Sequence, residues 1–167
     1  MSKRNSDGSV RKTLVEEFVE AAESLERCSE IMEKMTVKDI IEKNALGRNV
    51  LIQSIYSRCG LALVEKVYNK WPMLINIPDD KGQFPIHHAA SSHFNVAIFL
   101  FLLRVSSKKL LLTRDSAGHL PLDCVKFASF NEEGEEIRRR ELLKRGGIDE
   151  EAWTKKNDVT SNYILYL

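Results

Sequence analysis

One phrase recurs in this chain, and its spacing limits the fold more than any other feature. The fullest copy, Asp-Asp-Lys-Gly-Gln-Phe-Pro-Ile-His-His-Ala-Ala, covers residues 79–90, and a shorter copy, Asp-Ser-Ala-Gly-His-Leu-Pro-Leu-Asp, covers residues 115–123. A weaker third copy lies at residues 44–51. The glycines of the three copies, spaced 35 and 36 residues apart, are Gly47, Gly82 and Gly118. A period of this length indicates stacked units of supersecondary structure, because one such unit cannot bury its apolar face alone.

Each copy opens with Asp or Asn and has a glycine three residues later, which is typical of a tight turn with glycine at positive φ. Proline follows in two copies, where it suits the first turn of a helix. We therefore expect each turn to begin a pair of helices, in an all-α stack. The expected pairs are 50–56 with 61–69, 85–91 with 95–104, and 121–128 with 135–144, which divides residues 44–147 into units 44–78, 79–114 and 115–147.

The segments outside the repeats have different patterns. Residues 1–9 are small, polar and charged, which predicts a disordered tail. Residues 10–43 predict a helical N-terminal cap: one amphipathic helix from about Val10 to Met35, then a short helix over 37–43 that is capped by Thr36 and has Ile40 and Ile41 inward. Residues 148–167 are expected to form a C-terminal cap or tail. Its apolar end, 163–167, is expected to pack on the last repeat rather than to bind a groove of the PDZ type.

The composition is that of a globular protein with no bias toward nucleic acid or membranes. The chain has 167 residues, 43% of them hydrophobic and 29% charged, with a formal net charge of +1. This charge gives no general attraction for nucleic acid or anionic lipid. The longest apolar run, Val96 to Leu103, is too short to cross a bilayer. The N-terminus lacks the apolar core of a signal peptide, so we expect a cytoplasmic protein, with the nucleus as the alternative.

The sequence contains none of the motifs that would indicate catalysis or a bound metal. Its three cysteines, Cys28, Cys59 and Cys124, form no Cys-x-x-Cys pair, which argues against a disulfide framework and a zinc site. It has no glycine-rich phosphate loop, no Gly-x-Ser-x-Gly and no His-Glu-x-x-His. We therefore expect a protein that is not an enzyme and that has no catalytic residue, no cofactor and no metal.

These phrases resemble the ankyrin repeat, whose pattern is Asp-x-x-Gly-x-Thr-Pro-Leu-His-x-Ala-Ala. The resemblance implies an all-α ankyrin-repeat solenoid of helix-turn-helix units, in which His87 is a buried residue that bridges turn backbones. The family threonine is replaced by Asn49, Phe84 and Leu120, so two copies are expected to lose a local hydrogen bond worth roughly 0.5–1.5 kcal/mol. The residues that the resemblance makes structural are Asn44, Gly47, Asp79, Gly82, Pro85, His87, Asp115, Gly118 and Pro121.

In this family the turn tips and the exposed edge of the first helices form a concave binding strip. Its positions lie between the fixed residues of the motif, so they are free to vary. The resemblance thus implies a module that binds another protein through Arg48, Tyr56, Lys81, Gln83, His88, His119 and Phe127. Arg48, Tyr56 and Phe127 are the expected anchors, because arginine and aromatic residues dominate the energetics of interfaces. Each of these residues could equally be only solvated.

The kind of partner stays open at this point. Small ankyrin-repeat proteins of this size commonly regulate an enzyme, such as a protein kinase complex, or chaperone an assembly. A third hypothesis is a structural protein that dimerises through the apolar stripe between Leu14 and Met35. Enzyme activity is the least favoured hypothesis, because a fold without a catalytic constellation does not support it.

Overall fold

The computed structural model describes residues 13–91, 95–125 and 132–161, and every regular element in these ranges is a helix. The expected tail at 1–9 and the apolar end at 163–167 lie outside the described residues. The helices are α1 (Leu14–Glu20), α2 (Leu25–Lys34), α3 (Val37–Ile41), α4 (Val50–Ile55), α5 (Gly60–Lys70), the 3-10 helix η1 (Pro72–Asn76), α6 (Pro85–Ser91), α7 (Val96–Val105), α8 (Lys108–Leu111), α9 (Pro121–Cys124), α10 (Glu132–Gly146) and α11 (Glu150–Ser161).

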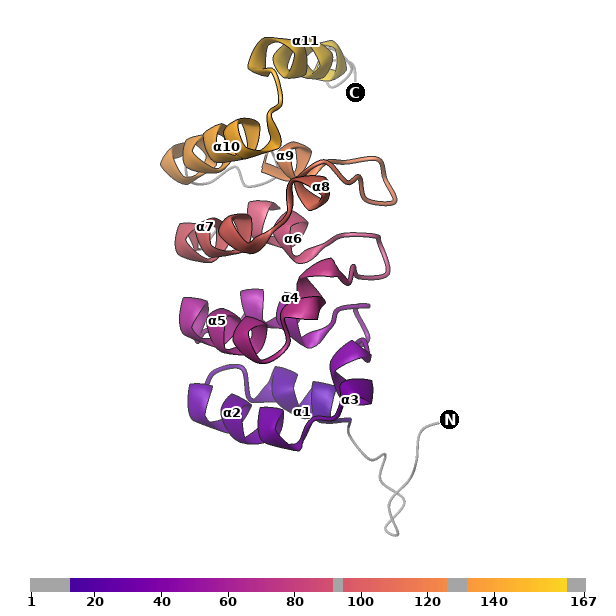
Figure 1. The fold of residues 1–167 in the computed structure, drawn as a ribbon, viewed down its shortest axis with the longest axis vertical. Helices are drawn as coiled ribbons and strands as arrows, with labels where there is room; N and C mark the ends of the chain where they lie inside the picture. The colour runs from indigo at the N-terminus through magenta and orange to yellow at the C-terminus, as the bar shows by residue number, and fades with distance from the viewer. Residues whose placement is uncertain (1–12, 92–94, 126–131, 162–167) are drawn as a thin grey trace.

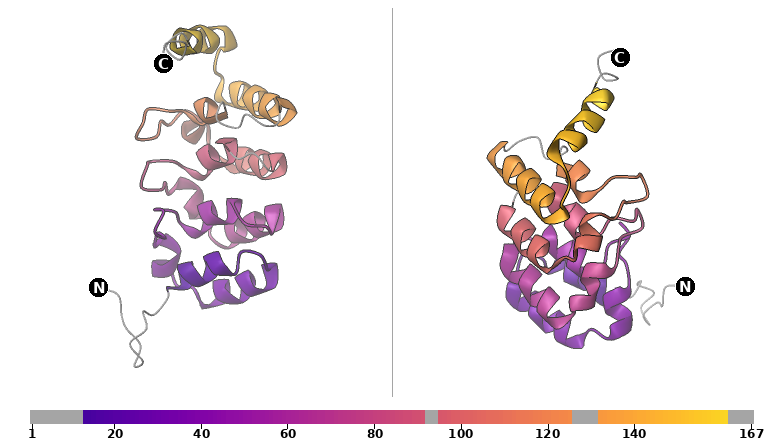
Figure 2. Two further views of the ribbon diagram at one scale, coloured as in Figure 1. Left: turned by 180° about the vertical axis from the view of Figure 1, so that it is seen from behind. Right: turned by 45° about the horizontal axis from the view of Figure 1, so that its top comes forward.

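The helices form pairs, and these pairs stack in chain order along the long axis of the molecule (Figure 1). One layer contains α1, α4, α6 and α9, which we call the inner helices, and the other contains α2, α5, α7 and α10, the outer helices. The loops that precede α4, α6 and α9 project together on the side away from the outer layer, as the view from behind shows (Figure 2, left). The repeated phrases therefore lie side by side on one edge of the molecule.

The three turns, at residues 44–48, 79–83 and 115–119, are built by the same hydrogen bonds. In each, the first side chain accepts two backbone N–H groups through Oδ1: Asn44 from Leu46 and Arg48, Asp79 from Lys81 and Gln83, and Asp115 from Ala117 and His119, all at 2.8–3.0 Å. The glycines have φ of 72°, 74° and 86°, which confirms the predicted positive values. Each turn is thus a local structure that the Asx-x-x-Gly sequence produces by itself.

A continuous apolar core runs between the two layers from α1 to α10. Phe18, Leu51, Ile86 and Phe99 have no exposed surface, and each buried side chain of this kind contributes roughly 1.5–3 kcal/mol. Ala89 and Ala90 are also buried in α6, which packs against its neighbours α4 and α9 in the inner layer. Small side chains at this point let the helices of successive units approach closely.

The helices of the first two repeats begin and end within one or two residues of their expected bounds, but the N-terminal cap differs. The single helix predicted from Val10 to Met35 is wrong: α1 ends at Glu20, and α2 starts anew after Ser24, whose hydroxyl accepts the N–H of Arg27. The break lets the two halves pack against each other, and the Cys28 thiol donates to the Ala21 carbonyl at 3.2 Å across it.

The apolar stripe between Leu14 and Met35 is engaged inside the molecule. Phe18, Cys28 and Met32 are buried, and α1 and α2 pack on α4 and α5. In the short helix that follows, Ile40 is buried as expected, whereas Ile41 is 49% exposed, contrary to expectation, because α3 ends at this residue. Most of this stripe therefore packs within the molecule, although Leu25 is 38% exposed.

The C-terminal end of the stack carries two long helices. The second helix of the third unit, α10, begins at Glu132 rather than at the expected 135. Residues 148–167 include α11, whose Trp153 donates its indole N–H to Asp123 Oδ1 on α9 at 3.0 Å. Asp123 stands where the ankyrin pattern has histidine, and its other oxygen accepts the N–H of Leu120 at 2.8 Å. The departure from the pattern thus coincides with a contact to α11.

Candidate partner-binding face

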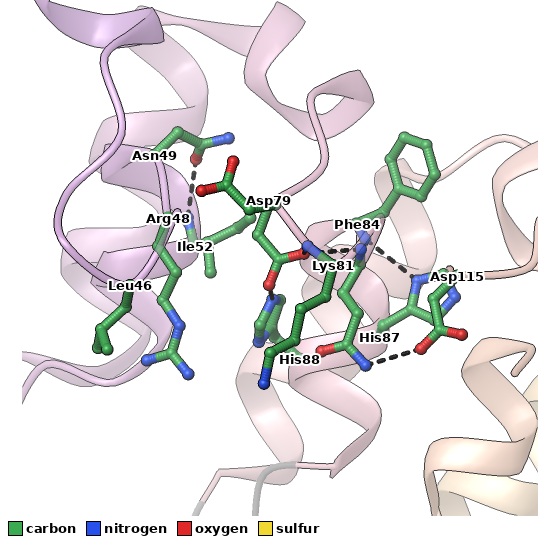
Figure 3. Close-up of polar contacts among 12 residues, drawn as sticks. Leu46, Arg48, Asn49, Ile52, Asp79, Lys81, Phe84, His87, His88 and Asp115 are labelled. Atoms are coloured by element: carbon green, nitrogen blue, oxygen red, sulfur yellow. Dashed lines mark hydrogen bonds and ion pairs between the residues drawn. The ribbon is translucent and has the colours of Figure 1, made fainter. Parts of the chain in front are cut away.

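The first and second turns are joined by a chain of contacts that we call the Tyr56 cluster: Arg48, Tyr56, His88 and Asp79. The Arg48 guanidinium lies over the Tyr56 ring, 4.3 Å from its centroid. The Tyr56 hydroxyl lies 2.8 Å from His88 Nδ1, and His88 Nε2 lies 3.1 Å from Asp79 Oδ2. Tyr56 is 44% exposed, whereas His88 is only 3% exposed. The cluster thus runs from the partly exposed Tyr56 to a buried carboxylate. Figure 3 shows three of its members, Arg48, His88 and Asp79.

The chemistry of its members assigns the protons in this cluster. A carboxylate only accepts hydrogen bonds, so His88 Nε2 carries a proton and donates it to Asp79. Nδ1 of the neutral ring is then an acceptor, and the Tyr56 hydroxyl donates to it. Burial, helped by the nearby Arg48 cation, lowers the pKa of His88 to about 4, although the Asp79 carboxylate acts in the opposite direction. His88 is therefore neutral at physiological pH.

The second and third turns are joined in a different way. Gln83 Nε2 donates to Asp115 Oδ2 at 2.8 Å, so the residue after one turn glycine binds the first residue of the next turn. Burial opposes ionisation of Asp115, but the donors Gln83, His119 and Ala117 outweigh it and hold the pKa of this carboxyl below its usual value. At the equivalent place in the first pair of turns, Asp79 Oδ2 is bound by His88 instead.

A groove of about 530 Å³ opens between the tips of the second and third turns. Two of its lining residues are joined by a backbone hydrogen bond from Ser116 N to Lys81 O at 2.9 Å. Apart from one alanine, its lining side chains are polar or charged, with an amide, a hydroxyl, an imidazole, an ammonium and two carboxylates. The lining residues are Asp80, Lys81, Gln83, Asp115, Ser116, Ala117 and His119. The groove thus offers several hydrogen-bonding side chains to a bound segment.

The motif residues use their polar atoms within the fold. His87 is fully buried; its Nδ1 accepts the N–H of Phe84 at 3.2 Å, and its Nε2 lies 3.3 Å from the His119 carbonyl, to which it donates. Asn49 takes over the role expected of threonine, because Oδ1 accepts two N–H groups of α4 and Nδ2 donates to the Ile77 carbonyl at 3.0 Å. The first unit therefore keeps its link to the following turn.

The structure gathers most of the predicted contact residues but removes one of them. Arg48 and Tyr56 lie against each other, and Lys81, Gln83 and His119 line the groove. The prediction that His88 contacts a partner is wrong, because its ring is buried and both nitrogens are engaged within the cluster. The remaining residue, Phe127, lies outside the described residues.

Two further variable turn positions belong to this face, although they are not among the contact residues selected from the sequence. Asp80 lines the groove and forms an ion pair with Lys43 at 2.7 Å, and Leu46 is 65% exposed at the tip of the first turn. Both occupy variable positions of the turn, next to its fixed residues, where the family pattern places contact residues. An ion pair over 37 residues of sequence depends on the stacking of the turns.

Two other kinds of site are not found in the described part of the chain. No group of three or more His, Cys, Asp or Glu residues within it is arranged to hold a metal ion. Among its helices, none has the length and apolar character needed to cross a membrane. No protein-family profile matches the chain, and no curated protein is significantly similar to it.

Proposed function

We propose that this chain is a small ankyrin-repeat protein without catalytic activity, and that it binds a partner protein through the edge formed by its turns and inner helices. The proposal combines the Asx-x-x-Gly turns at a period of 35–36 residues with the pairing of the helices that follow them. Solenoids of this kind use their exposed edges as binding surfaces. The binding face in this proposal contains Arg48, Tyr56, Lys81, Gln83 and His119.

This face is supported by a difference between the fixed and the variable residues of the repeated phrase in how their polar groups are used. The fixed residues Asp79, His87 and Asp115 direct their polar atoms into the fold, where turns and helix starts use them. By contrast, Lys81 and Arg48 form no ion pair with any residue in the described ranges. Together with the partly exposed ring of Tyr56, they offer the residue types that are favoured at the centres of interfaces.

Site-specific photocrosslinking tests the face directly. A photoreactive amino acid is placed at one exposed turn position, Leu46, Lys81 or Ala117, and the purified variants are irradiated in a lysate of the native cells. We expect a common crosslinked protein from these three positions. The matched controls are Lys66 and Lys144, which are exposed on the outer helices α5 and α10. If the same protein crosslinked equally from the outer helices, the proposed face would be wrong.

The narrower hypothesis of a regulatory subunit is tested with the same captured protein. If the partner belongs to an enzyme complex such as a protein kinase, its turnover should change when the purified chain is added in stoichiometric amount. The Arg48→Gln, Lys81→Gln double variant serves as the control. Unchanged turnover at saturating concentration would leave a binding module but exclude a regulator of that enzyme.

A further inference from the structure

Two cations on neighbouring turns extend to the same side of the molecule. Arg48 follows the glycine of the first turn, and Lys81 precedes the glycine of the second (Figure 3). Lys81 is exposed and Arg48 is partly exposed. Within the described residues neither forms an ion pair, although Asp79 and Asp80 lie in the same turn as Lys81. The two carboxylates are already engaged by His88 and Lys43.

Arg48 forms no ion pair within the described residues, and His88 occupies the oxygen that corresponds to the one bound by Gln83 in the next pair of turns. The equivalent residue in the next turn, Gln83, binds Asp115 Oδ2 at 2.8 Å. In the first pair of turns the corresponding oxygen, Asp79 Oδ2, is bound by His88 Nε2. Arg48 instead stacks on Tyr56, which leaves its guanidinium N–H groups without a carboxylate. In the described part of the chain Arg48 is thus oriented by Tyr56 but is paired with no carboxylate.

The Tyr56 cluster holds this arginine in place. A guanidinium over an aromatic face is stabilised by about 0.5–1 kcal/mol at an exposed site, and its edge stays available for hydrogen bonds. Tyr56 in turn is held through its hydroxyl by the buried His88, which packs edge-on against its ring at 5.8 Å between centroids. Pre-organisation of this kind reduces the entropy that is lost on binding.

We propose that Arg48 and Lys81 bind two carboxylates of an acidic segment in the partner protein. In this arrangement Tyr56 lies beneath the Arg48 guanidinium, and the exposed Leu46 lies beside Arg48. This inference rests on the proposed function and specifies the chemistry of the partner. Arginine matches a carboxylate through two parallel hydrogen bonds, and lysine provides a second point charge. Packed helices lie about 8–10 Å apart, so cations on successive units match acidic residues two or three positions apart in an extended segment.

Selection from a random library of displayed twelve-residue peptides tests the acidic preference without knowledge of the partner. The bait is the full chain, and a parallel selection uses the Arg48→Gln, Lys81→Gln double variant. We expect Asp and Glu to be enriched in the peptides selected by the native chain, and that enrichment to disappear with the variant. A selection dominated by neutral or basic peptides, or one without any enrichment, would overturn the inference.

Fluorescence anisotropy with a selected acidic peptide then measures the contribution of the two cations. The double variant should bind at least tenfold more weakly, and affinity should fall as salt is raised, because the contacts are charged. A matched double variant on the outer helices, Lys66→Gln with Lys144→Gln, removes the same net charge and should bind like the native chain. Equal loss in both double variants would show non-specific attraction and contradict the assignment.

The outcomes separate this inference from the proposed function. If neutral peptides are selected and crosslink at Leu46 or Ala117, the chain binds proteins at the turn edge but does not require acidic residues. If no peptide is selected and no protein crosslinks at the turns, both proposals fail. Binding of single-stranded DNA with the affinity of the acidic peptides would also overturn the inference, because the cations would then recognise phosphate.

Discussion

At the scale of single residues, one position of the inner helix decides how the turns are linked. Gln53, His88 and Cys124 occupy the same place in the three units. Gln53 accepts from Asn44 Nδ2 at 3.1 Å and His88 donates to Asp79, so each binds the first residue of its own turn. Cys124 has no comparable group, and Asp115 Oδ2 is bound from the preceding unit by Gln83. The side chain at this position therefore decides whether the first residue of its turn can be bound by the residue that follows the glycine of the preceding unit.

The buried histidine makes stability depend on pH. Because the folded pKa of His88, about 4, lies below the ordinary value of 6.5, the unfolded chain binds the proton more readily. Above pH 6.5 the titration of His88 does not reduce the free energy of unfolding. As the pH falls from 6.5 toward 4, the free energy of unfolding decreases by up to roughly 3 kcal/mol, because only the unfolded chain takes up the proton. Urea unfolding between about pH 7.5 and 4 measures it. His88→Gln, which copies Gln53, should reduce the slope; an unchanged slope would contradict the neutral, buried histidine.

Two turn glycines provide a matched pair of substitutions. Gly118 has positive φ and open space where alanine would add its methyl group, so Gly118→Ala should cost only the backbone strain, about 1–2 kcal/mol. At Gly82 the same methyl would also lie 2.8 Å from Ser116 Oγ and 3.0 Å from Ser116 N, so Gly82→Ala should cost more. Thermal and urea unfolding give both values. Equal costs would mean that the contact between the second and third turn tips is not tight.

At the scale of elements, the sequence predicts what is determined locally. Turns and helix starts follow from Asx side chains, positive-φ glycines and prolines within a few residues of one another, and the predicted bounds of α4, α5 and α6 hold to within one or two residues. The break between α1 and α2 was missed because Ala21 and Ala22 continue the helical spacing, and only Ser24 marks a new start. Packing against α4 and α5 favours two short helices over one long one.

The binding face was predicted less well, because its contacts join residues far apart in the chain. His88 looks like a variable surface residue in the phrase, but its ring is bound by Tyr56 at the end of α4, 32 residues away in sequence, and by Asp79 in the turn of its own unit. The same holds for Asp123, one of whose oxygens is bound by Trp153 on α11, 30 residues away in sequence. Fixed positions were thus interpreted correctly from sequence, whereas positions that link units required the structure.

The docking of α11 rests on the Trp153–Asp123 hydrogen bond. Trp153→Phe keeps an aromatic ring but removes the indole donor, and should destabilise the protein by about 0.5–1.5 kcal/mol. Asp123→Ala should cost more, because it also leaves the Leu120 N–H at the start of α9 without its acceptor. Urea unfolding ranks the two variants. The reverse order would mean that α11 contributes more than the capping of α9.

At the scale of the whole molecule, the structure is a linear stack in which each unit contacts mainly its neighbours. The α1–α2 pair packs on α4 and α5, those on α6 and α7, and those on α9 and α10. Stability in such an array is approximately the sum of unit and interface terms. A substitution that removes core packing at one end should therefore destabilise the units at that end first. A similar substitution in the middle should destabilise the units on both sides of it.

Hydrogen exchange distinguishes an end defect from a central one. Phe18 in α1 and Phe99 in α7 are both fully buried, so replacement of either by Ala removes about 3–5 kcal/mol of packing. Phe18→Ala should speed exchange in α1, α2 and α4 and leave α7 and α10 close to the native rate. Phe99→Ala should speed exchange in α4 to α10. Faster exchange along the whole stack in the Phe18 variant would instead mean that the units unfold as a single cooperative body, since an isolated end would not transmit its loss to α10.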